Sequence, residues 1–260
     1  MKKLVLALVL VLLPAGAFAV SARQIMTKSQ EAFYYPGKDF KARMIMTLSS
    51  AGGQKRIREL TMLRKNFSGG NQKYFIYFYR PADVKDMTFM VYKYPDRNSD
   101  RWLYIPALDM VRRIAASDKR SSFVGSDFSY EDVSGRNVNE DTHILVKQEK
   151  LGGKDCYVVK SVPKEADVEF SGKLSWIDKS SFLPLKEEYY DRRGQLLKIF
   201  TADEIKTIKG FPTITKRTMK NVQSGHWTQV EFEKADYNIG LPDNLFSERF
   251  MKQPPRKWIE

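Results

Sequence analysis

The sequence contains few of the residues that build catalytic and metal sites. It has one cysteine, Cys156, and two histidines, His143 and His226, among 260 residues. A single cysteine excludes an intramolecular disulfide even in an oxidising compartment, and a thiol on a strand usually packs as a small apolar side chain. Neither histidine has further ligands at a metal-binding spacing. The sequence therefore predicts no metal site and no cofactor.

Motifs of the large enzyme classes are also absent. The chain has no Gly-x-Ser-x-Gly, His-Glu-x-x-His, Cys-x-x-Cys or phosphate-binding loop. Acidic residues do occur in pairs, at Glu131/Asp132, Glu140/Asp141 and Glu187/Glu188. Because neighbours on a strand face opposite sides, such pairs are poorly placed for general acid–base catalysis. The sequence favours a protein that is not an enzyme, with no catalytic residue.

Basic residues outnumber acidic ones. The sequence has 44 Lys and Arg and 31 Asp and Glu, which gives a formal net charge of +13. The basic residues are scattered, and no nucleic-acid-binding motif accompanies them. One interpretation is a solvated surface that keeps the protein soluble. The other is attraction to anionic lipid or an acidic partner, which contributes about 1 kcal/mol for each basic residue near such a surface. The two interpretations are compatible.

The one long apolar run lies at the N-terminus. Lys2 and Lys3 precede the apolar residues 4–19, and Ala17-Phe18-Ala19 fits the small-x-small cleavage rule. Residues 1–19 are therefore predicted to be a signal peptide, with cleavage after Ala22 as an alternative site. An uncleaved membrane anchor is the other interpretation, although the run is short for one.

The mature chain is expected in the periplasm of a Gram-negative bacterium, because the apolar run is compact and follows a lysine pair. No cysteine follows this run, so the protein is not itself a lipid-anchored lipoprotein. Residues 20–260 contain no linker-like or low-complexity stretch, which predicts a single domain.

The mature chain begins with a helix and continues with strands. Residues 21–35 have helical periodicity, and Pro36-Gly37 ends the helix. From Phe40 onward, alternating apolar residues are separated by short turns rich in glycine. This pattern predicts a mainly β protein with a few helices (α+β), in which about eleven antiparallel strands form a meander. So many strands need a barrel, a sandwich or a strongly curved sheet to bury their apolar face.

The stretch from Arg101 to Val133 interrupts this regular pattern. Pro106 separates an aromatic-aliphatic run from a return strand, residues 110–114, which predicts a hairpin. A polar segment follows at residues 116–122, a candidate for a lid or a contact loop. Beyond it, Ser126 or Asp127 is expected to cap a short helix.

Methionine and aromatic side chains are frequent, with 10 Met and an aromatic content of 13%. Methionine fills irregular cores, but it also suits surfaces that accept flexible apolar ligands. The second interpretation predicts a hydrophobic hollow bounded by the sheet. The residues expected to line it are Met44, Met46, Met62, Phe75, Tyr77, Phe89, Val91, Trp102, Tyr104, Met110, Phe123, Phe128 and Tyr130. The basic residues expected to contact a partner or a membrane are Arg112, Arg113, Lys119 and Arg120.

Three segments resemble the LolA-like family of outer-membrane lipoprotein-sorting proteins. They are WLYIPALDMVRRI, SFVGSDFSYEDV and WIDKSSFLPLKEEYYDRRGQLLK, which begin at Trp102, Ser122 and Trp176. The resemblance covers nearly all of residues 20–260. It implies an unclosed antiparallel β-barrel of about eleven strands, with helices covering the concave face. No residue here corresponds by motif to the gating arginine of LolA, so the residues expected in the hollow come from alternation alone.

The resemblance also implies a function. A LolA-like half-barrel receives acyl chains in its hollow, so this chain is expected to be a periplasmic carrier of lipoprotein or other lipid toward the outer membrane. An inner-membrane transporter and an outer-membrane acceptor are the implied partners, together with transient contact with a membrane surface. The alternative is a non-enzymatic interaction module with the same fold, either a transporter accessory or a sensor of lipoprotein or envelope stress.

Overall fold

The computed structural model describes residues 20–165 and 168–260. The predicted signal peptide, residues 1–19, lies outside the described residues. Within them, no helix is both long enough and apolar enough to cross a membrane.

One antiparallel sheet contains all the strands, as the alternating pattern predicted, but there are thirteen of them rather than about eleven. The hairpin that begins near Trp102 adds two short strands of its own. The strands are β1 (Asp39–Ser49), β2 (Lys55–Asn66), β3 (Gln72–Arg80), β4 (Thr88–Lys93), β5 (Asp100–Ile105), β6 (Met110–Ile114), β7 (Asp141–Leu151), β8 (Lys154–Pro163), β9 (Phe170–Asp178), β10 (Pro184–Asp191), β11 (Leu196–Ile208), β12 (Phe211–Asn221) and β13 (Trp227–Tyr237).

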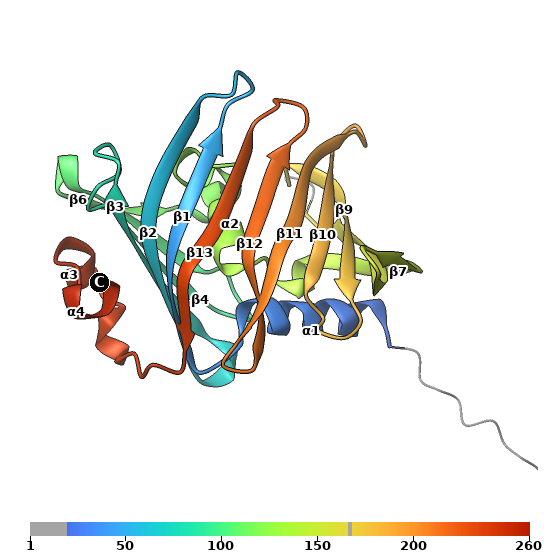
Figure 1. The fold of residues 1–260 in the computed structure, drawn as a ribbon, viewed down its shortest axis with the longest axis horizontal. Coiled ribbons are helices and arrows are strands. Elements are labelled where there is room, and N and C mark those ends of the chain that lie inside the picture. Colours follow the sequence, from blue (N-terminus) through green and yellow to red (C-terminus); the bar gives the residue numbers. More distant parts are fainter. Residues whose placement is uncertain (1–19, 166–167) are drawn as a thin grey trace, which may run out of the picture.

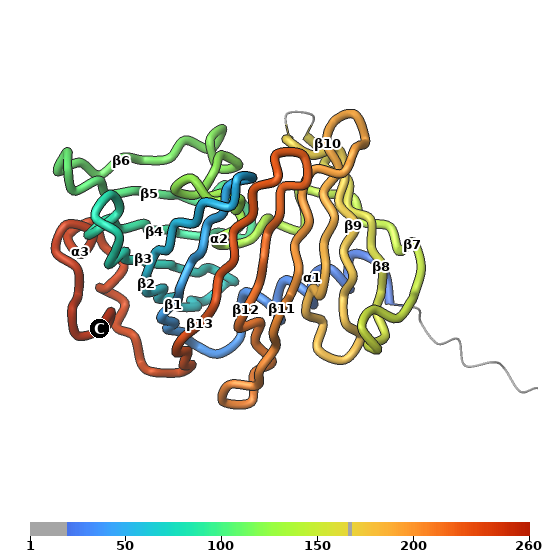
Figure 2. The backbone as a smooth tube through the Cα atoms, turned by 45° about the horizontal axis from the view of Figure 1, so that its top comes forward, coloured from blue at the N-terminus to red at the C-terminus, as the bar shows by residue number. Residues whose placement is uncertain are grey.

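The sheet is open, because its outermost strands, β6 and β7, do not pair with each other among the described residues. The strand order runs from β6 back to β1, then from β13 back to β7. Apart from β6 and β7, strands that are consecutive in sequence pair with each other, and β1 also pairs with β13. The sheet twists so strongly that β3 to β6 run crosswise to β9 to β12 (Figure 2). This curvature produces the unclosed barrel that the resemblance implied.

Two helices lie on the concave side of the sheet (Figure 1). The first, α1 (Ala22–Tyr34), begins at a capping box in which Ser21 and Gln24 bond each other's backbone N–H groups. The second, α2 (Tyr130–Ser134), begins at Ser129, which forms a similar box with Asp132. The prediction that Ser126 or Asp127 caps this helix was wrong, because only Ser129 has an acidic residue three positions later inside the helix.

The concave face carries the larger apolar core. Met44, Phe78 and Phe89 are almost completely buried there, and Phe123 and Tyr130 pack on Phe89 from the segment that leads into α2. These aromatic pairs have ring centroids 5.2 and 5.3 Å apart, a separation that adds to the stabilisation from burial alone. The segment between β6 and β7 therefore fills one half of the hollow with its own side chains.

The opposite face of β2 to β4 is covered by the C-terminal segment, which contains α3 (Glu248–Lys252) and α4 (Arg256–Ile259). Phe246, Met251 and Ile259 are buried against the sheet, and each contributes roughly 1.5–3 kcal/mol by burial. The Thr88 hydroxyl donates to the Met251 carbonyl at 3.0 Å. Because both faces of β3 are covered, this strand is apolar in every position from Tyr74 to Phe78.

The chain enters this segment through a turn held by Asp39. The carboxylate of Asp39 is buried and accepts the N–H groups of Ile239, Gly240 and Leu241 at 2.7, 3.0 and 2.9 Å. Consecutive backbone N–H groups of this kind form an anion-binding concavity. The first residue of β1 therefore anchors the start of the C-terminal cover.

Replacing Asp39 by Asn is expected to lower the free energy of unfolding by about 1–3 kcal/mol, because the uncharged amide leaves part of this donor set unsatisfied. Urea denaturation measures the loss, and amide hydrogen exchange in residues 241–260 should accelerate. Asp243→Asn is the control, since Asp243 pairs with Lys65 at the surface, where ion pairs contribute less than about 1 kcal/mol. Equal losses of unfolding free energy in the two variants would contradict the role of Asp39 as the anchor of the C-terminal segment.

Candidate functional site

A cavity of about 150 Å³ lies between α1, α2 and the concave face of the sheet. An engineered protein cavity of about this size binds a benzene ring. Its border has an aromatic and apolar part, which includes Phe33, Phe40, Phe128, Phe200, Met219 and Phe232, and a charged part, which includes Arg64, Arg136, Glu187 and Arg217. The cavity is thus the part of the hollow that the protein's own side chains leave unfilled.

Helix α1 forms one wall of the cavity and is held at its C-terminal end. Phe33 meets Phe200 of β11 edge-on, with ring centroids 6.2 Å apart. The carbonyl of Tyr34 accepts hydrogen bonds from Arg64 Nη1 at 2.6 Å and from Gln72 Nε2 at 2.8 Å. Because Arg64 and Gln72 are themselves buried in β2 and β3, they fix this end of α1 more firmly than surface contacts would.

A fully bonded carboxylate, Glu187 of β10, also borders the cavity. It accepts hydrogen bonds from Lys173 at 2.7 Å, Ser175 at 2.8 Å and the Tyr189 hydroxyl at 2.7 Å. Burial, reinforced by the charge of Glu187, raises the pKa of Tyr189 well above its ordinary value. The tyrosine therefore stays neutral near pH 7 and its hydroxyl donates a hydrogen bond to Glu187, so this wall has little free hydrogen-bonding capacity.

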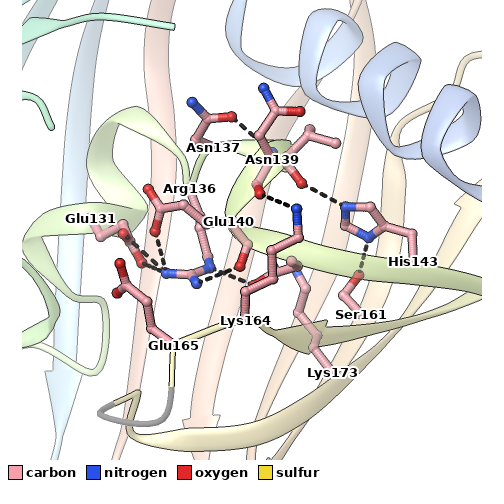
Figure 3. Close-up of polar contacts among 12 residues, drawn as sticks. Glu131, Arg136, Asn137, Asn139, Glu140, His143, Ser161, Lys164, Glu165 and Lys173 are labelled. Carbon is pink, nitrogen blue, oxygen red and sulfur yellow. Dashed lines mark hydrogen bonds and ion pairs between the residues drawn. The ribbon is translucent and has the colours of Figure 1, made fainter. Parts of the chain in front are cut away.

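A buried ion network joins α2 to the start of β7 (Figure 3). Glu131 lies 3.3 Å from both Lys119 and Arg136. Glu140 lies 3.0 Å from Lys119 and 2.7 Å from Arg136, and Arg136 also pairs with Asp141 at 2.9 Å. Each cation thus has at least two carboxylates, which offsets part of the desolvation that burial imposes.

The network fixes the segment that was a candidate lid. Residues 116–120 form a short 3₁₀ helix, η3, and the ammonium of Lys119 near its end is buried among the carboxylates. His143, beside the network, is held between the Ser161 hydroxyl and the Val138 carbonyl, each at 2.8 Å (Figure 3). Within residues 20–165 and 168–260, no three His, Cys, Asp or Glu side chains gather so that they could hold a metal ion.

Lys93 is buried where α1 and α2 end. Its Nζ donates to the Ser134 carbonyl at 2.6 Å and lies 5.0 Å from the ring centroids of Tyr34 and Tyr35. Burial lowers the pKa of Lys93 to about 7, and the positive charges of Arg101 and Arg64 act in the same direction. Near neutral pH this lysine therefore changes its charge inside the protein.

The folded pKa of Lys93 lies below that of an unfolded chain, so the unfolded state binds more protons between about pH 7 and pH 10. The contribution of Lys93 to stability is therefore least favourable below pH 7 and improves as the pH rises through this window. The free energy of unfolding of Lys93→Met, relative to that of the wild type, should be about 1–3 kcal/mol higher at pH 6 than at pH 9. Urea denaturation at both pH values measures this difference. The exposed Lys85→Met should follow the wild type, and a pH-independent difference for Lys93→Met would refute this account.

The residues predicted to line the hollow divide between the two faces of the sheet. Eight of them lie in the concave core: Met44, Met46, Met62, Phe89, Val91, Phe123, Phe128 and Tyr130. Of these, Met62 and Phe128 border the cavity itself. On the opposite face, the C-terminal segment covers Phe75, Tyr77, Trp102 and Tyr104, while Met110 is exposed on β6.

The predicted contact residues differ in exposure. Arg112 and Arg113 are exposed on β6, and Arg113 forms an ion pair with Asp100. Lys119 is buried in the ion network. Arg120 is partly buried and lies 2.8 Å from Glu165. Only the first two therefore present their charges on an open surface.

Several residues at the cavity were not predicted from the sequence, because they lie on elements that showed only regular helical or strand periodicity. They are Phe33 and Tyr34 of α1, Phe200 of β11, Arg217 and Met219 of β12 and Phe232 of β13. The available indication was Arg217, an arginine two residues from the buried Met219 and therefore on the same face of its strand.

Comparisons with known proteins agree with this fold. A family model described as that of an uncharacterized protein matches residues 70–253. No curated protein matches the sequence. A DUF1329 family protein from Desulfovibrio piger is 28% identical, with a TM-score of 0.82, over 88% of this chain and 97% of its own.

Two other solved structures share this fold. A domain from Vibrio parahaemolyticus, assigned to the outer-membrane lipoprotein-sorting proteins, is 29% identical with a TM-score of 0.82, over 89% of this chain and 98% of its own. A LolA superfamily protein from Nitrosomonas europaea shares the fold at 21% identity and a TM-score of 0.70, over 89% and 100%. The family match and the shared open sheet with its covering helices establish that the chain belongs to the LolA-like family.

Proposed function

We propose that this protein is a periplasmic carrier, without enzymatic activity, that binds acyl chains of a lipoprotein or other lipid and moves them toward the outer membrane. The observation that carries the proposal is the cavity between α1 and the concave face of the sheet, part of whose border is aromatic and apolar. The likeness to the Vibrio domain assigned to lipoprotein sorting supports it. The N-terminal apolar run with its Ala17-Phe18-Ala19 site supports export. The exported part would be a single domain, residues 20–260.

Hydrophobic burial supplies the binding energy of such a carrier. Each CH₂ group removed from water contributes roughly 0.8 kcal/mol, so a chain of ordinary length gains on the order of 10 kcal/mol before the cost of ordering it. A cavity of about 150 Å³ accepts only part of that chain, because benzene fills a cavity of this size. Loading a whole chain would therefore require the cavity to enlarge by movement of α1 or α2 away from the sheet.

Native mass spectrometry of protein purified without detergent tests the proposal. A carrier should retain lipid that appears as an added mass, and delipidated protein should bind a fluorescent fatty acid. A protein that carries no lipid and excludes the fatty acid would contradict the carrier function.

The β5–β6 hairpin is our candidate for contact with a membrane during loading or delivery. At its tip Leu108 and Met110 are 65% and 41% exposed, and Arg112 and Arg113 lie on the adjoining strand. Exposed apolar residues beside basic ones suit an anionic lipid surface. The inner-membrane transporter and the outer-membrane acceptor, the expected donor and recipient of the cargo, would approach the same end of the protein.

The double variant Arg112→Gln/Arg113→Gln is expected to bind anionic vesicles several-fold more weakly than the wild type in a sedimentation assay, because about 1 kcal/mol is lost for each charge. Neutral vesicles should show no such difference. Lys55→Gln/Arg56→Gln, an exposed basic pair at the distant β1–β2 turn, is the matched control. An equal loss from both pairs would indicate general charge attraction rather than contact by the hairpin.

A further inference from the structure

Arg217 of β12 lies at the cavity between three phenyl rings. Its Cζ atom is 5.6 Å from the ring centroid of Phe33, 6.0 Å from that of Phe128 and 5.5 Å from that of Phe232. These rings come from α1, from the segment that precedes α2 and from β13. The guanidinium is thus surrounded by aromatic faces contributed by separate parts of the chain, at a point where the cavity remains open.

The hydrogen-bonding groups of Arg217 are unused by the protein. It forms no hydrogen bond and no ion pair with any other residue that the structure describes, although a guanidinium has five N–H donors. The other arginines at the cavity have direct partners. Arg64 donates to the Tyr34 and Pro36 carbonyls and leaves only its Nε unbonded, and Arg136 pairs with three carboxylates. The lack of any hydrogen-bonded partner therefore distinguishes Arg217 from these two arginines.

Neither neighbouring acid forms an ion pair with Arg217. Asp132 is the carboxylate whose field acts on Arg217, but its Oδ2 accepts the N–H and the hydroxyl of Ser129 at 2.7 and 2.8 Å. Glu187 is occupied by Lys173, Ser175 and Tyr189. Burial lowers the pKa of Arg217, yet arginine remains protonated in proteins. A guanidinium without a direct hydrogen-bond partner is stabilised when a ligand supplies an anion within bonding distance.

We propose that Arg217 binds the anionic group of a lipid, a carboxylate or a phosphate, whose hydrocarbon chain occupies the apolar part of the cavity. This inference rests on the carrier function proposed above and names its class of cargo. A planar guanidinium matches both anions, since it can donate two parallel hydrogen bonds to either of them. The first carbons of the chain would then lie against Phe33, Phe200 and Met219, which border the same cavity. A cargo joined to its chains only through neutral esters or amides would leave Arg217 unsatisfied.

Competition binding tests this inference with ligands that share one chain and differ in the head group. Hexadecanoate, hexadecyl phosphate and hexadecanol displace a neutral fluorescent alkyl probe from delipidated protein at pH 8, with inorganic phosphate alone as a fourth ligand. We expect the two anionic ligands to bind at least tenfold more tightly than hexadecanol, since a hydrogen bond to a charged group contributes about 1.5–3 kcal/mol. Inorganic phosphate should not displace the probe.

Two variants attribute the preference to Arg217. Arg217→Met, which is similar in length and uncharged, should lose the preference for anions while keeping its affinity for hexadecanol. Arg217→Lys should retain part of the preference. Arg112→Met, at an exposed site on β6, should behave as the wild type. Thermal unfolding of each variant confirms that it is folded.

The outcomes separate this inference from the carrier function. If no ligand binds to the wild type, the carrier function fails and this inference fails with it. If the wild type binds hexadecanol as tightly as the anions, or if Arg217→Met keeps the preference, the carrier stands and the role of Arg217 is refuted. Displacement by inorganic phosphate alone would show a site for free phosphate. It would overturn the proposal that the anion bound by Arg217 belongs to a lipid.

Discussion

Replacing Ala32 by Trp is expected to empty the carrier of lipid. Ala32 lies on α1, borders the cavity and packs against the concave core. An indole ring is larger than the benzene ring that fills a cavity of about this size, so the new side chain occupies the space that we assign to the acyl chain. Because a chain of ordinary length gains on the order of 10 kcal/mol by burial, even partial blockage should weaken binding by about 100-fold or more.

Native mass spectrometry of detergent-free protein and titration with a fluorescent fatty acid measure this loss. Ala82→Trp, in the exposed turn after β3, introduces the same side chain away from the cavity and should load lipid as the wild type does. Circular dichroism should show an intact sheet in both variants. An Ala32→Trp protein that still carries lipid would move the binding site elsewhere in the fold.

Replacing Glu131 by Gln is expected to lower the free energy of unfolding by about 3–5 kcal/mol, the usual result of removing one partner from a buried ion pair. Glu131 is almost fully buried and faces both Lys119 and Arg136. Glutamine has nearly the same shape but no charge, so the change isolates the electrostatic contribution. The two cations would then depend on Glu140 and Asp141 alone.

Glu165→Gln provides the matched control. Glu165 also pairs with a basic residue, Arg120, but its side chain is 60% exposed, so the loss should stay below about 1 kcal/mol. Urea denaturation with unchanged m-values would assign both effects to the folded state. Similar small losses in the two variants would mean that solvent reaches the network and that it does little to hold α2 in the hollow.

Periodicity was sufficient to predict the sheet but not which face of it is hollow. Strand β3 is apolar on both sides, and alternation cannot distinguish the concave Tyr74 and Ile76 from Phe75 and Tyr77, which the C-terminal segment covers. That distinction depends on where residues 241–260 return in space, and a local sequence pattern contains no such information. The lining prediction consequently mixed residues from both faces.

The cavity was less accessible to prediction than the sheet, because its walls come from α1, α2 and strands from both ends of the chain. Phe33 and Arg217 are separated by most of the sequence, and nothing local marks them as neighbours. The cap of α2 was different, since Ser129 and Asp132 form a capping-box pattern that is visible in the sequence. Local hydrogen-bonding rules could have identified that cap, whereas the cavity required the tertiary structure.

The pairing of β1 with β13 has a consequence for how the chain folds. In the described sheet every other pairing joins strands that are consecutive in sequence, whereas Met46 lies opposite Val230. Local hairpins close quickly, and contacts between distant residues form slowly because ordering the intervening chain costs entropy. We therefore expect two meanders, β1–β6 and β7–β13, to form first and to be joined late along this single seam. Until that step the concave core is divided and exposed, so the folding chain would need protection from aggregation until the seam has formed.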